Sequence, residues 1–117
     1  MDGVVVYRDL DARSHKDEAF EKFRLAVCMP SETTVDGTPY FSCQVYYGPI
    51  DDPIVHSVYG EDRMAALENG LAFLTFFAAS LDNTHEVRAT ESGRPYAELL
   101  LPISKKLRED LARKLTE

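Results

Sequence analysis

Two cysteines and three histidines are the residues of this 117-residue chain most suited to nucleophilic or metal chemistry. Cys43 and His56 fall on neighbouring predicted strands, where a thiol and an imidazole could act as nucleophile and base. No local feature of the sequence would activate the thiol. The histidines, His15, His56 and His85, lack the spacing of metal ligands. The sequence therefore predicts no metal and no cofactor, and a Cys–His hydrolase is kept only as a contrast.

The remaining polar patterns are those of a protein without a catalytic centre. Cys28 and Cys43 are too far apart for a redox Cys-x-x-Cys pair, and their predicted strands could place them as buried thiols or join them in a disulfide. Asp51 and Asp52 lie in a proline-flanked turn, which favours a solvated loop. No glycine-rich junction of strand and helix offers a phosphate site. We expect the chain not to be an enzyme.

Composition and charge limit the class of partner. With 44% hydrophobic and 28% charged residues, the chain is typical of a single globular domain over residues 1–117. Its net charge of −7 disfavours nucleic acid or an anionic membrane, because phosphate binding needs clustered Lys and Arg. The apolar run at 71–81 is about half the length that crosses a bilayer. We expect a cytoplasmic, bacterial protein whose partner is another protein.

The hydrophobic pattern predicts an α+β fold, in which an antiparallel meander of four or more strands packs against one long helix. Alternating or β-branched runs predict strands at 4–10, 20–29, 40–48 and 54–60, with a short edge strand near 84–89. Residues 30–39 read as a loop with a tight Asp36-Gly37 turn. After the helix at 61–81, residues 95–102 read as strand or extended chain, and a second helix is expected at about 105–115.

The helix predicted at 61–81 is too apolar for one covered face. One stripe along it has spacings of three and four residues and contains Met64, Leu67, Leu71, Leu74, Ala78 and Leu81. Phe73, Phe76 and Phe77 lie beside or away from that stripe. Either the C-terminal segment, with leucines at 99–101, covers them, or they form an interface. Gly70 would suit close approach of another backbone.

Tyrosines form the other candidate surface. If the apolar side of the strand at 40–48 packs on the helix, Tyr40 and Tyr46 face outward. Exposed tyrosines beside acidic residues are typical of protein-binding patches.

The segment "YFSCQVYYGPI" followed by "YGEDRMAALENGLAFL" resembles small bacterial α+β domains of unknown function over residues 40–81. In those domains a strand ends in Gly-x-Asp, and the next helix carries Ala-Leu. Gly60, Asp62, Ala66 and Leu67 match that pattern, whereas Met64 and Ala65 stand where a Gln would be expected. The resemblance implies the fold and structural roles for these residues, and no activity.

The sequence thus predicts a non-enzymatic protein-interaction module that self-associates as a homodimer through the helix at 61–81. Its interface candidates are Phe73, Phe76, Phe77, Tyr40 and Tyr46. The alternative is an immunity-type protein that neutralises a basic toxin through its acidic surface.

Overall fold

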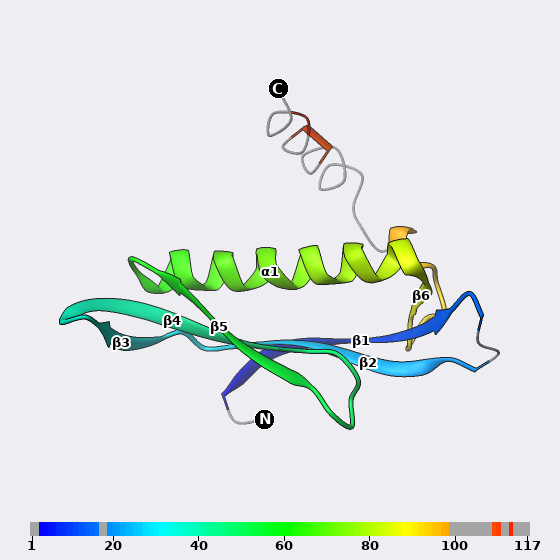
Figure 1. Ribbon diagram of the computed structural model, residues 1–117, viewed down its shortest axis with the longest axis horizontal. Helices are drawn as coiled ribbons and strands as arrows, with labels where there is room; N and C mark the ends of the chain where they lie inside the picture. The colour runs from blue at the N-terminus through cyan, green and yellow to red at the C-terminus, as the bar shows by residue number, and fades with distance from the viewer. Residues whose placement is uncertain (1–2, 17–18, 99–108, 111–112, 114–117) are drawn as a thin grey trace.

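An antiparallel sheet with one long helix laid across one face makes up the structure (Figure 1). The computed structural model describes residues 3–16, 19–98, 109–110 and 113. In chain order the elements are β1 (Val4–Ser14), β2 (Glu21–Cys28), β3 (Ser31–Val35), β4 (Thr38–Tyr47), β5 (Ile54–Gly60), α1 (Arg63–Thr84), β6 (His85–Ala89) and the 3-10 turn η1 (Tyr96–Glu98). The predicted α+β class with an antiparallel sheet is confirmed.

The order of the six strands in the sheet follows from the pairing of β4. Its Phe41–Tyr47 stretch pairs with β5 on one side. Its other side pairs with β3 near the start of β4 and with β2 near the end, so β3 and β2 lie end to end. β1 pairs with β2, and β6 pairs with the second half of β1. The sheet is therefore not the simple meander that was predicted, because β6 returns beside β1 after the helix.

A hairpin formed by β3 and β4 replaces the loop predicted at residues 30–39. Asp36 and Gly37 have φ angles of 51° and 79°, so the predicted tight turn is present and joins two paired strands. β3 is polar and largely exposed, and it has no apolar alternation by which the sequence could reveal a strand. The loop prediction was wrong because pairing with β4, not burial, forms this strand.

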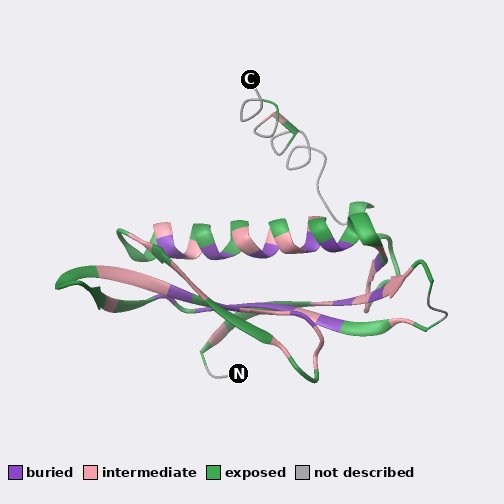
Figure 2. Cartoon of the chain, viewed as in Figure 1, coloured by how far each residue is buried: buried purple, intermediate pink, exposed green. Residues whose placement is uncertain are grey.

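The core lies between the sheet and the lower side of α1 (Figure 2). Sheet residues such as Leu10, Val27 and Val45 are almost fully buried. On α1 the buried positions are Ala66, Gly70, Leu74, Ala78 and Leu81. Met64 and Leu71 of the predicted stripe are instead exposed, so the buried side of the helix is rotated away from the predicted one.

Small residues let the helix lie close to the sheet. A Cβ added at Gly70 would stand 2.9 Å from Cys43 Sγ and 3.3 Å from Val45 Cγ1. Gly70 is thus required by close side chains of the sheet rather than by another backbone. Gly60 has a similar role before the helix, because a Cβ there would collide with the Ala66 nitrogen.

Asp62 caps the amino end of α1, and its Oδ1 accepts a hydrogen bond from the Ala65 N–H at 2.7 Å. The helix therefore begins at Arg63 rather than at residue 61. It continues past the predicted end to Thr84, where the His85 N–H donates to the Leu81 carbonyl. By length and composition alone α1 could also cross a membrane, a property that core helices of soluble domains share.

The second helix predicted at 105–115 lies outside the described residues except for residues 109, 110 and 113. In the described chain after β6 the only regular structure up to residue 98 is η1, which follows a bridge between Arg88 and Pro95. The strand or extended segment predicted at 95–102 is therefore a 3-10 turn as far as Glu98.

Candidate functional site

The three phenylalanines predicted to be surplus have different surroundings. The ring of Phe73 lies with its centroid 5.2 Å from that of Tyr47, and the Phe77 centroid is 4.7 Å from Tyr47. Phe73 also stacks on His56, with 4.8 Å between centroids. These two rings are half-buried against the core of their own chain, whereas Phe76 is 73% exposed. Of the three phenylalanines, Phe76 alone is largely exposed among the residues that the structure describes.

The sheet covers the side of α1 that carries Phe73 and Phe77, because α1 does not lie over the centre of the sheet. The helix packs chiefly over β4 and β5, and β5 rises toward the amino end of α1 (Figure 1). Tyr47 and His56 therefore reach the helix side that carries Phe73 and Phe77. The other explanation for the surplus, a cover formed by the leucines at 99–101, falls on residues outside the described ones.

β5 is an open strand beside this part of the helix. In the described residues it pairs only with β4, and its register is unbroken from Ile54 to Gly60. Its sequence, IVHSVYG, contains no Asp, Glu, Lys or Arg. About half of the surface of Ile54, Val55 and Tyr59 is exposed. Natural edge strands usually carry a charge, a proline or a bulge that prevents further pairing, and β5 has none of these.

The first half of β1 is also open, because β6 pairs only with Leu10–Ser14. Val5, Val6 and Tyr7 are about half exposed. This edge differs from β5 in two ways. A bulge lies between Val4 and Val6, and Arg8 is charged. Both features are typical of edges protected from pairing.

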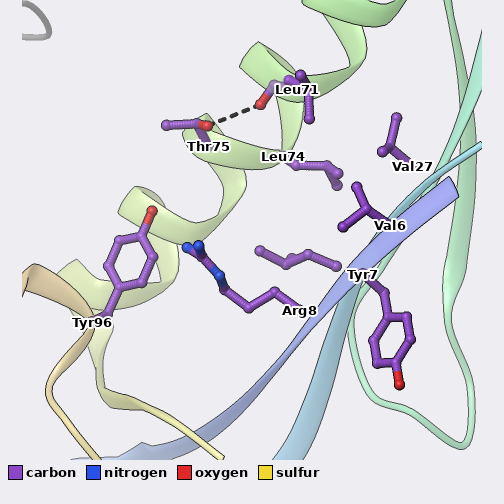
Figure 3. Close-up of a pocket in the computed structure, with 9 residues that line it drawn as sticks. Val6, Tyr7, Arg8, Val27, Leu71, Leu74, Thr75 and Tyr96 are labelled. Atoms are coloured by element: carbon purple, nitrogen blue, oxygen red, sulfur yellow. Dashed lines mark hydrogen bonds between the residues drawn. The ribbon is translucent and has the colours of Figure 1, made fainter. Parts of the chain in front are cut away.

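An apolar groove of about 240 Å³ separates this half of β1 from α1 (Figure 3). Val6 and Leu74 point into it, Arg8 extends along its rim, and Tyr7 points away. Its remaining walls are formed by Leu25, Val27, Leu71, Thr75 and Tyr96. The groove exists because the helix is displaced toward β5. The polar side chains in its lining are those of Tyr7, Arg8, Thr75 and Tyr96.

The two tyrosines predicted to face outward lie at different places on the sheet. Tyr40 lines a hollow of about 410 Å³ together with Tyr59, Glu61 and Asp62. Tyr46 is half-buried and lies in a cross-strand row with Val55, Ala26 and Tyr7. This row is on the sheet face away from α1, because Val45 and Val27 beside it face the core. The structure does not unite Tyr40 and Tyr46 in one patch.

The cysteine and histidine candidates are not arranged as a reactive pair. Cys43 is fully buried, and its thiol donates to the Cys28 carbonyl at 3.3 Å. Burial raises the pKa of the Cys43 thiol, so the thiolate is disfavoured. His56 is paired with Val45, which follows Cys43 by two residues on β4. The His56 ring stacks on Phe73. No disulfide joins Cys28 and Cys43, and both are buried.

Among the described residues no three His, Cys, Asp or Glu side chains are grouped as metal ligands. His15 lies just after β1, and His85 caps the end of α1, with its Nδ1 2.7 Å from Thr84 Oγ1. An ionic contact between β1 and β2 was not anticipated from the sequence. Arg24 donates from Nε and Nη2 to the two Asp9 carboxylate oxygens at 2.6 and 2.9 Å. The hydrogen bond from Arg24 lowers the pKa of Asp9.

The positions that resemble the bacterial domain pattern have structural roles. Asp62 caps the helix, Ala66 is fully buried under it, and Gly60 permits the tight approach of strand and helix. Leu67 packs at the border of the core. Comparison of the chain with protein-family models, with curated proteins and with solved structures found no match.

Proposed function

We propose that this protein is a non-enzymatic protein-interaction module that self-associates through the surface of α1. The observation that carries the proposal is the exposure of Phe76, 73% of whose surface is open to solvent. It projects from a stretch of the helix, Asn69 to Leu81, that contains no charged residue. Burying one such ring is worth about 2 kcal/mol, and aromatic residues often dominate the binding energy of an interface.

The charge of the chain supports an interface at an uncharged surface. Each copy carries a net charge of −7, so two copies repel one another at long range. Contact through the Phe76 side of α1 brings no acidic side chain of residues 69–81 into the interface. We therefore expect self-association to strengthen as salt screens the repulsion.

Sedimentation velocity over a range of protein concentrations tests the proposal. We expect the wild-type protein to form dimers and the Phe76→Ser variant to remain monomeric at the same concentrations. Met64→Ser is the matched control, because Met64 is 64% exposed on the same helix but on its opposite flank. Circular dichroism melts of both variants show whether folding is preserved. A wild-type protein that stays monomeric at every concentration would contradict the proposal.

A second candidate function, binding to a basic protein such as a toxin, is favoured by the hollow at the amino end of α1. Two acidic residues, Glu61 and Asp62, line it together with Tyr40 and Tyr59. Acidic and aromatic groups together suit a Lys or Arg side chain. Asp62 is engaged in capping the helix, so Glu61 is the residue available to a cation.

Titration with a Lys- and Arg-rich peptide tests this candidate. We expect binding to weaken with increasing salt and with Glu61→Gln, whereas Glu91→Gln, on the turn after β6, serves as the charge-matched control. Equal binding by both variants would mean that the hollow is not the site. The opposite salt dependences of the two functions allow them to be distinguished.

A further inference from the structure

We infer that two copies of this chain join edge to edge through β5, in antiparallel orientation, so that their sheets become one continuous sheet. This inference rests on the proposed self-association and specifies its partner and geometry. A two-fold axis perpendicular to the sheet keeps both α1 helices on the same face. The helix flanks that carry Phe76 then face each other across the junction.

One backbone group at the open edge of β5 is already engaged within its own chain. The Tyr59 carbonyl accepts a hydrogen bond from Asn69 Nδ2 at 2.7 Å, so it points away from β4, and it would accept a second hydrogen bond in this pairing. Main-chain groups of alternate residues in a strand point to the same side. Ser57 and Val55 therefore also present their N–H and C=O groups to the open edge. Within the described residues no other strand pairs with that edge.

The register follows from the length of the strand. Antiparallel self-pairing that overlaps all of Ile54–Gly60 has its axis at the central residue, Ser57, which then faces its own copy. Val55 comes opposite Tyr59 of the second copy. Both side chains lie on the face away from α1, because His56 between them is opposite the core residue Val45. Aromatic and β-branched residues are a favourable cross-strand pair.

Charge distinguishes β5 from the open edge of β1. Pairing through β5 places no Asp, Glu, Lys or Arg of either strand at the junction, so the repulsion between two acidic chains is not increased there. The β1 edge has a bulge between Val4 and Val6 and the charge of Arg8. A second copy is therefore better accommodated at β5.

The position of Phe76 links this edge to the helix. Phe73 stacks on His56 of β5, so the Phe73 side of α1 overhangs the open edge. Phe76 follows three residues later on the neighbouring part of the helix surface. Joining two β5 strands would cover Phe76 and the exposed side chains of β5 in one event.

A charged side chain at position 57, on the two-fold axis, tests the β5–β5 pairing specifically. Because Ser57 would face itself, Ser57→Lys and Ser57→Glu should each weaken dimerisation by about tenfold or more, as like charges become opposed. An equimolar mixture of the two variants should recover dimers, since unlike charges then meet. Gln44→Lys is the matched control. Gln44 lies opposite Ser57 on β4, is exposed on the same face, and is not at the edge.

Sedimentation velocity with both variants, their mixture and the control measures these outcomes. Oxidation of a Ser57→Cys variant gives a second readout, because a disulfide-linked dimer should form across the axis and a Gln44→Cys variant should not form one. Dimers of wild-type strength in both charged variants, or no recovery in the mixture, would overturn the β5 geometry. If Phe76→Ser still abolishes dimers in that case, the proposed function survives without this inference. A monomeric wild-type protein would overturn both.

Discussion

At the scale of single residues, close packing against the sheet determines where glycine is needed in α1. Glycine in a helix costs about 1 kcal/mol relative to alanine, so the sequence alone would favour replacing Gly70. The structure predicts the opposite. A methyl group at Gly70 would stand 2.9 Å from Cys43 Sγ. Gly70→Ala should therefore lower the free energy of unfolding by about 1–3 kcal/mol through overpacking.

Urea denaturation followed by circular dichroism measures this effect. Combining Gly70→Ala with Cys43→Ala removes the sulfur that the methyl group meets, so the double variant should lose less stability than the sum of the two single variants. Additive losses would show that the Cys43 contact is not the cause.

The contact between Asp9 and Arg24 makes stability depend on pH. Because Arg24 lowers the pKa of Asp9 in the folded state, the contact stabilises the protein at pH values above the ordinary Asp pKa of about 4. That stability is lost as the pH falls below this value and passes through the lowered pKa. Asp9→Asn should cost about 1 kcal/mol near neutral pH, a figure reduced for partial exposure of both side chains.

Thermal denaturation of both proteins across the acidic range measures the difference. The two stabilities should converge in acid, and a gap that stays constant with pH would contradict the assignment. Asp36→Asn, on the exposed β3–β4 turn, is the control for loss of a carboxylate.

At the scale of elements, the start of α1 depends on one side chain. Asp62 Oδ1 accepts from the Ala65 N–H, which otherwise has no partner within the helix. Asp62→Ala should lower the free energy of unfolding by about 1 kcal/mol, and Asp62→Ser, which can also cap, should restore most of it. Chemical denaturation of the three proteins provides the measurement. Equal losses in both variants would indicate that charge rather than capping is responsible.

Strand signals in the sequence predicted all the strands except the polar β3. Residues 40–48 alternate clearly, residues 54–60 contain β-branched residues, and both are strands. β3 has no such signal, and β1 runs four residues past the predicted end because β6 pairs with it there. β6 is distant from β1 in sequence, and β3 lacks the apolar residues that mark a buried strand, so a local hydrophobic pattern could predict neither feature.

The candidate surface was predicted only in part, for a geometric reason. The sequence correctly marks α1 as more apolar than one flat face can cover. It cannot show that β5 rises beside the helix, which is why Tyr47 and His56 shield Phe73 and Phe77. Phe76 alone keeps the predicted exposure. The openness of the β5 edge likewise depends on strand order, which the local sequence does not encode.

At the scale of the whole molecule, both thiols report on unfolding. Cys43 and Cys28 are buried, and burial raises the pKa of each. Alkylation by iodoacetamide should therefore be slow in the native protein and limited by opening of the fold. Mass spectrometry of the labelled protein should show modification rising with urea in parallel with loss of helical signal. Rapid labelling of the native protein would show that the core between β2, β4 and α1 opens locally.

The β3–β4 hairpin has a consequence for engineering. Its turn at Asp36 and Gly37 carries exposed residues, and β3 contributes nothing to the buried core. A foreign peptide grafted at this turn would be displayed away from Phe76 and from the groove beside β1. The hairpin thus offers a place for an epitope or a fluorescent label that leaves both surfaces accessible.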